Sequence, residues 1–112
     1  MRRNFVICWA GLVWAGSLAL AAAADIEHGR QLFESPALGG GTTGKSCKTC
    51  HAGGARLSKN FADQKSYMIM GMEKQTLAEV VNVCIEKPLG GKAIDPQGQD
   101  MADLIAYLQT LK

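Results

Sequence analysis

The feature that most constrains this chain is the segment Cys47-Lys48-Thr49-Cys50-His51, its single match to the pattern Cys-x-x-Cys-His. Two thiols at this spacing can each bond to a vinyl group of one haem, while the adjacent imidazole coordinates the iron. A disulfide or a thioredoxin-like redox pair would leave His51 without a role, and the sequence lacks the strand and helix context of a thioredoxin motif. The motif therefore predicts one covalently attached haem c, with Cys47 and Cys50 as thioether sites and His51 as the proximal iron ligand.

The first 24 residues have the composition of an export signal. A pair of arginines precedes an apolar run that extends from Phe5 to Leu20, and alanines then lead to Asp25. This order predicts a secretory signal peptide at residues 1–24 and a cytochrome domain at residues 25–112. The apolar run is also long enough to anchor the chain in a bilayer if it stays uncleaved. We therefore predict a periplasmic protein that is attached to the membrane only in its uncleaved form.

The domain left after cleavage is near the size at which a chain has difficulty burying enough apolar surface alone, so a covalently held haem would complete its core. The full chain has a net charge of +2, and loss of the two signal arginines leaves a formally neutral protein. No basic run with interleaved aromatic residues is present, so the sequence predicts no nucleic-acid partner. Of the cysteines left after cleavage, the haem uses two, and Cys84 needs another explanation.

The hydrophobic pattern is helical, and no segment shows a convincing period-two strand. Asp25 can cap a first helix that ends near Pro36, and a short helix is expected near Tyr67. Thr76 and Glu79 form a capping box. The apolar stripe that follows the box has helical spacing: Leu77, Val80, Val81, Cys84 and Ile85. A last amphipathic helix carries a second stripe: Met101, Leu104, Ile105, Leu108 and Leu111. The sequence therefore predicts an all-α domain of three to five helices around one haem.

Residues 39–46, Gly-Gly-Gly-Thr-Thr-Gly-Lys-Ser, match the phosphate-binding pattern Gly-x4-Gly-Lys-Ser. A phosphate loop follows a buried strand and opens a helix inside a parallel sheet. Here Glu34-Ser35-Pro36 come shortly before the segment, the haem cysteines follow it, and no sheet can be built from the rest of the chain. We therefore predict a flexible surface loop and no bound nucleotide.

With its elements in this order, the chain resembles the single-domain class I cytochromes c. The resemblance is carried by Gly29 and Phe33, by the haem motif, and by Asp103-Leu104-Ile105-Ala106-Tyr107-Leu108. In that family a glycine lets the first helix cross the last one closely against an aromatic side chain, and the resemblance assigns these roles to Gly29 and Tyr107. Two features depart from the family pattern: a longer loop before the haem motif, and no proline after it to support the imidazole.

The class I resemblance does not supply the distal iron ligand. Its members offer a methionine from the loop before the last helix, where this chain reads Gly90-Gly91-Lys92-Ala93-Ile94. The candidates that remain are Cys84, the cluster of Met68, Met70 and Met72, and Met101. Met101 lies on the last apolar stripe and is most simply core filling. Cys84 also lies on an apolar stripe, where a free cysteine can be an inert buried residue.

A second resemblance favours Cys84. The similar segments are Tyr67, residues 77–84, Gly91-Lys92-Ala93 and residues 99–108. They resemble the haem domains of thiosulfate-oxidising cytochromes, namely thiosulfate dehydrogenase and the dihaem subunit of the periplasmic sulfur-oxidising complex. The resemblance implies that Cys84 is a thiolate ligand, and the methionine cluster, with Met70 and Met72, stays as the alternative given by the residues alone. Those enzymes place basic residues around the cysteine, whereas this sequence has only Lys87 near it, and the domain is too short for a second haem.

These observations predict a one-electron carrier between periplasmic redox proteins, without catalytic residues and without a ligand role for His28. One alternative is a sulfur-compound oxidoreductase, or its subunit, in which basic residues converge on a reactive Cys84. The other is a high-spin gas-binding protein with no sulfur near the iron. Gly-Arg-x-Leu-Phe and Ser-Cys-x-Thr-Cys-His segments resemble those of the sphaeroides haem protein family, which illustrates that alternative. A thiolate ligand would lower the reduction potential and a thioether would raise it.

Overall fold

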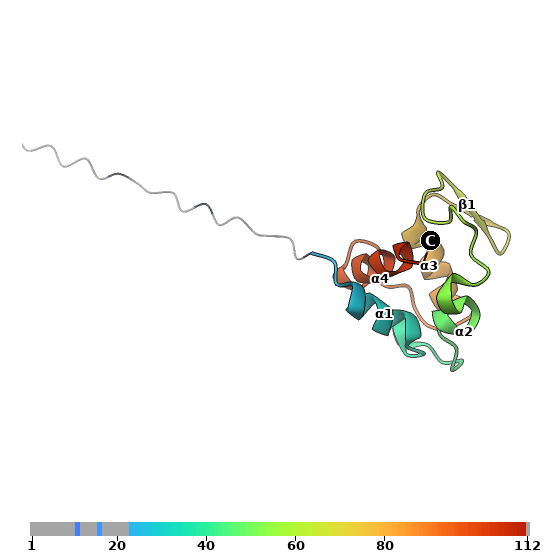
Figure 1. Ribbon diagram of the computed structural model, residues 1–112. Coiled ribbons are helices and arrows are strands. Elements are labelled where there is room, and N and C mark those ends of the chain that lie inside the picture. The colour runs from blue at the N-terminus through green and yellow to red at the C-terminus, as the bar shows by residue number, and fades with distance from the viewer. Residues whose placement is uncertain (1–10, 12–15, 17–22, 112) are drawn as a thin grey trace, which may run out of the picture.

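The computed structural model describes residues 11, 16 and 23–111, so most of the predicted signal peptide lies outside the described residues. The described part of the chain contains four α-helices: α1 (Ile26–Glu34), α2 (Cys47–His51), α3 (Leu77–Glu86) and α4 (Gln99–Gln109). Two short 3₁₀ turns, η1 (Leu38–Gly40) and η2 (Ala52–Gly54), flank α2, and a hairpin of β1 (Tyr67–Ile69) and β2 (Met72–Lys74) precedes α3 (Figure 1). Within the described residues, no helix is long and apolar enough to cross a bilayer.

The helix boundaries follow local capping signals. The Asp25 carboxylate accepts the backbone N–H of His28 at 3.0 Å, which starts α1 at the predicted residue. At α3 the Thr76 hydroxyl accepts the N–H of Glu79, and the Glu79 carboxylate accepts the N–H of Thr76 at 3.0 Å. Both caps were expected from the sequence and are confirmed.

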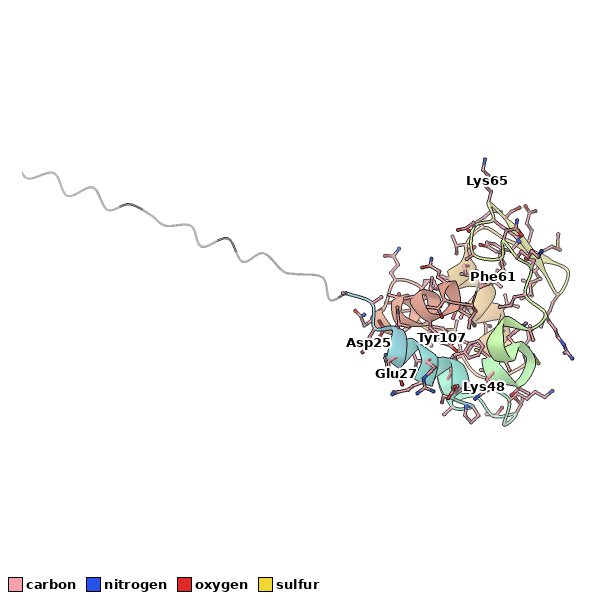
Figure 2. All side chains as sticks on the ribbon, in the orientation of Figure 1. Asp25, Glu27, Lys48, Phe61, Lys65 and Tyr107 are labelled. Atoms are coloured by element: carbon pink, nitrogen blue, oxygen red, sulfur yellow. The ribbon has the colours of Figure 1, made fainter. Side chains whose placement is uncertain are left out.

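Helices α1 and α4 cross at close range (Figure 1). A Cβ atom placed on Gly29 would lie 2.0 Å from the carbonyl oxygen of Asp103 and 2.9 Å from the Cβ of Tyr107. Phe33 meets the Tyr107 ring edge-on, with centroids 5.1 Å apart and an interplanar angle of 61°. Figure 2 shows Tyr107 beside this crossing. The contact predicted between Gly29 and Tyr107 is therefore confirmed.

The hairpin of β1 and β2 is an element that the sequence pattern did not predict. Ile69 lies opposite Met72 in an antiparallel pair, and the chain reverses at Met70 and Gly71. These two residues have φ values of +49° and +76°, the combination that a two-residue type I′ turn requires. The helix expected near Tyr67 is wrong, and the all-α prediction is corrected to a mostly helical domain with one short hairpin.

The glycine-rich segment 39–46 is a packing element of the fold. The segment begins inside the 3₁₀ turn η1. A phosphate loop, in contrast, begins directly after a β-strand. The Lys92 N–H donates to the Gly39 carbonyl at 2.8 Å, and the Thr42 N–H donates to the Leu89 carbonyl at 2.8 Å. Residues 42–45 are exposed, so the predicted surface loop is confirmed, and its backbone bonds tie it to the chain that follows α3, which the sequence did not reveal.

A buried carboxylate joins the start of α1 to α4. Asp103 is 2% exposed, and its oxygens accept three hydrogen bonds of 2.7 Å, from the Asp25 N–H, the His28 Nδ1–H and the Gln99 side-chain amide. His28 is therefore a partner of Asp103, and not the solvated side chain that the sequence suggested. The side chain of Asp103 therefore links the N-terminal end of α1 to α4.

We expect this cluster to make stability depend on pH. The hydrogen bond to Asp103 raises the pKa of His28 above its ordinary value of 6.5. The Asp25 N–H, and then His28, lower the pKa of Asp103 below its ordinary value of 3.8. Stabilisation by His28 is complete below pH 6.5 and is lost as the pH rises through the raised pKa. Stabilisation by Asp103 is complete above pH 3.8 and is lost as the pH falls through the lowered pKa.

The difference in thermal unfolding midpoint between the native protein and Asp103→Asn should therefore be largest between pH 3.8 and pH 6.5. His28→Gln should reduce the decline on the alkaline side of this window and leave the decline on the acid side unchanged. The control is Gln109→Ala at the exposed end of α4, which should shift the midpoint equally at every pH. A difference between native protein and Asp103→Asn that does not vary with pH would contradict the prediction.

Candidate haem-binding site

The haem motif lines a cavity of about 460 Å³, a volume within the range of small-molecule and cofactor pockets. Its walls come from α1, α2, α3, α4, the hairpin and the loop before the hairpin. Most of the lining side chains are apolar, among them Phe33, Leu57, Phe61, Leu77, Val81 and Leu104. An apolar cavity with a few polar groups at one side suits a porphyrin, whose faces are apolar.

Helix α2 brings the three motif residues to this cavity. The Ser46 N–H donates to the Thr49 hydroxyl at 2.9 Å, which fixes the first turn of the helix. Cys47 and Cys50 are three residues apart and therefore lie on one face of that turn. Both are free thiols, and both line the cavity with His51. The predicted attachment sites and the predicted proximal ligand are thus brought together.

The orientation of His51 is set by a backbone group. Its Nδ1–H donates to the carbonyl oxygen of Ala55 at 2.8 Å. A carbonyl can only accept, so this bond fixes the proton on Nδ1 and leaves the Nε2 lone pair free for a metal. A second hydrogen bond of this kind orients most histidine ligands. The Ala55 carbonyl, in the turn after η2, therefore supports the imidazole in a chain that has no proline after the motif.

The described residues include three free cysteines, of which Cys50 is exposed and Cys47 and Cys84 are partly buried. Burial, and then the neighbouring Cys84 and Cys50, raise the pKa of Cys47 to about 11. Burial, and then Cys50, raise the pKa of Cys84. All three thiols line the cavity. A Cys84 thiolate would therefore need a strong compensating cation, and a coordinated iron is such a cation.

The distal candidates differ in their relation to the cavity. Cys84 lines it from α3, as its helical spacing with Leu77 predicted. Met68 and Met70 also line it, but they are 73% and 57% exposed. Met72 is not among the lining residues, and Met101 is 1% exposed in the core and does not line the cavity either. The structure thus keeps Cys84, Met68 and Met70 as candidates and leaves Met72 and Met101 outside the lining of the cavity.

The loop before α4 offers no ligand because it is turned away. Ala93, at the position where class I members have methionine, is exposed and does not line the cavity. The next residue, Ile94, is clamped to α3 by Asn82, whose side chain donates to the Ile94 carbonyl and accepts the Ile94 N–H, both at 2.9 Å. Since this clamp fixes the loop, residue 93 stays away from the cavity.

Positive charge does not converge on Cys84. Arg56 is the one permanently charged residue among the described residues that line the cavity, and its side chain is exposed. Lys87, the base nearest to Cys84 in the sequence, is not among them. No cation contributes to the pKa shift of Cys84. The described residues also contain no group of three or more His, Cys, Asp and Glu side chains that could hold a bare metal ion.

Together, the four helices, the haem motif and the apolar cavity define a cytochrome c domain. The family model of the SoxA/TsdA cytochrome c domain matches residues 28–111, and the chain belongs to this family. Neither a comparison with curated proteins nor one with solved structures gives a match. The chain is therefore a cytochrome c domain related to the cytochromes of sulfur oxidation, with covalently bound haem c and a haem electron-transfer role.

Proposed function

We propose that this protein is an exported monohaem cytochrome that carries one electron at a time between redox proteins of the periplasm, with His51 and Cys84 as the axial ligands. When bound, the haem supplies an iron that cycles between the ferric and ferrous states. The observation that carries the proposal is that Cys84 lines the same apolar cavity as Cys47, Cys50 and His51. Cys84 is the most buried of the three distal candidates that line it, since Met68 and Met70 are mostly exposed.

The residues around the site have separate tasks in this proposal. His51 is held by Ala55 with its Nε2 directed away from that hydrogen bond. The apolar walls formed by Leu77 and Val81 of α3 exclude water and so favour a stable coordination. Cys50 is exposed, so the attachment side of the cavity lies at the protein surface. An electron can therefore be exchanged with a partner there without any large movement of the chain.

A second candidate function is that of a sulfur-compound oxidoreductase or its subunit. Membership of the SoxA/TsdA family favours a role in sulfur oxidation. A cysteine that binds thiosulfate would need basic side chains for the anionic substrate, and the described lining residues place none beside Cys84. We therefore propose that the protein carries electrons in such a system and does not itself oxidise the sulfur compound. The high-spin gas-binding alternative is disfavoured because a sulfur does line the cavity.

Redox titration of the purified, haem-loaded protein should give a reversible one-electron wave. Thiosulfate with an artificial electron acceptor should give no turnover, because the cavity provides no anion-binding cations at Cys84. Dithionite, a strong small reductant that needs no binding site and reduces low-potential haems, is the control for a competent haem. Turnover of thiosulfate that is abolished by Cys84→Ser would establish the enzyme instead. Rapid binding of carbon monoxide by the untreated ferrous protein would favour the gas-binding alternative.

A further inference from the structure

The buried carboxylate of Asp103 has no role at the haem cavity, because it does not line it. Its partner at the chain start is a backbone nitrogen: the N atom of Asp25 lies 2.7 Å from Asp103 Oδ1. Ala23 and Ala24, just before this nitrogen, are exposed and lie outside any helix. Figure 2 shows Asp25 at the beginning of α1. The carboxylate is thus aimed at the atom that becomes the chain terminus if the predicted signal peptide is removed.

We propose that Asp103 holds the free α-amino group of Asp25, which is created when a signal peptidase hydrolyses the bond between Ala24 and Asp25. Water adds across this peptide bond, leaving a carboxylate on Ala24 and an ammonium group on Asp25. The hydrogen bond seen between Asp25 and Asp103 then becomes an ion pair. Processing would thereby stabilise the docking of α1 on α4. This inference rests on the export part of the proposed function and is independent of the distal haem ligand.

The surroundings of Asp25 suit a positive charge. A free ammonium at the N-terminus of a helix is unfavourable, because the helix dipole is positive there. The carboxylates of Asp25, Glu27 and Asp103 all lie at this end of α1 and offset the charge. Cleavage removes one weak contact, from the Gln99 amide to the Ala23 carbonyl at 3.4 Å. It strengthens the bond of 2.7 Å to Asp103, because the donor gains a positive charge opposite an acceptor that is already a carboxylate.

The charged groups that face Asp103 are few. Asp25 and His28 come from α1 and its cap, and Asp100 lies on α4 one turn before Asp103. His28 already donates to the second oxygen, Oδ2, so the amino group and the imidazole occupy different oxygens of the carboxylate. The two cations can therefore bind at once, and each titrates in its own pH range.

The test compares two haem-loaded proteins purified after export, both carrying His28→Gln so that the imidazole does not titrate. One has the native junction. The other has Gly-Ser inserted between Ala24 and Asp25, which restores an amide at Asp25 after cleavage. Intact mass identifies the first residue of each protein. Thermal unfolding midpoints are then recorded from about pH 6 to about pH 10, across the ordinary α-amino pKa of about 8.

We expect the native-junction protein to begin at Asp25. Its midpoint should fall by about 4–8 °C, relative to the insertion protein, as the pH rises through the α-amino pKa, the shift that one such bond gives in a domain of this size. Asp103→Asn in the native-junction background should abolish this difference. A native protein that begins at another residue would overturn the proposal. So would equal pH dependence of the two proteins, even if Asp103→Asn failed to fold. The haem spectra test the proposed electron-transfer function separately.

Discussion

Cys84→Ser should change the ferric absorption and electron paramagnetic resonance spectra, and Cys84→Met should raise the reduction potential by on the order of 100 mV or more, within the roughly 0.8 V range that axial ligands span. The reason is the charge of the ligand. A thiolate is anionic and stabilises ferric iron, whereas a thioether is neutral and favours ferrous iron. Spectra of the purified protein and potentiometric titration measure the two effects directly. The expected change is large because a ligand bond to the iron is lost or replaced.

Met70→Leu and Met72→Leu are the matched controls for this experiment. Met70 lines the cavity and Met72 does not. If Cys84 is the ligand, neither methionine binds the iron, and both substitutions should leave the ferric spectrum unchanged. The opposite pattern would be decisive. An unchanged spectrum for Cys84→Ser, together with a changed one for Met70→Leu, would show that Met70 is the distal ligand. The protein would then be a carrier with a high reduction potential.

Gly29→Ala should lower the free energy of unfolding by about 3 kcal/mol, the upper end of the usual cost of overpacking. The added methyl group would lie 2.0 Å from the carbonyl oxygen of Asp103, a backbone atom that cannot move aside as a side chain can. Helices α1 and α4 would have to separate, and Phe33, which lines the cavity at this crossing, would shift with them. Denaturant unfolding of the haem-loaded protein measures the loss.

Gln31→Ala is the control on the same helix. Gln31 is exposed, so its truncation should change the free energy of unfolding by less than about 0.5 kcal/mol. If Gly29→Ala were as stable as this control, the close approach of α1 and α4 would not hold in solution. The packing explanation for the glycine would then fail.

The helices could be predicted because their signals are local. Asp25 caps α1 from three residues away, and Thr76 with Glu79 caps α3 over the same distance. The hairpin could not be predicted in this way, since its strands have three residues each and its turn places the non-glycine residue Met70 at a positive φ. The signal that could have revealed it was Gly71, in the second position of a two-residue turn.

The site was predictable only in part, because the sequence shows local spacing but not contacts between distant segments. The motif gave Cys47, Cys50 and His51, and the helical spacing of α3 gave Cys84 as a residue of the cavity wall. The support of His51 by the Ala55 carbonyl was not predictable, because it is a backbone contact that depends on the turn η2. The role of Asp103 was also missed, since its partners Asp25 and His28 lie more than 70 residues away in the sequence.

The loop that resembles a phosphate site has a consequence for electron-transfer rates. It leads into α2, and its backbone bonds from Thr42 to Leu89 and from Lys92 to Gly39 attach it to the segment just after α3. The two helices that carry His51 and Cys84 therefore share one rigid frame. In the proposed coordination by His51 and Cys84, a frame of this kind would resist displacement of either residue when the charge on the iron changes, and so would keep the reorganisation energy small. Residues far from the metal can in this way set how fast an electron moves while leaving the equilibrium potential unaltered.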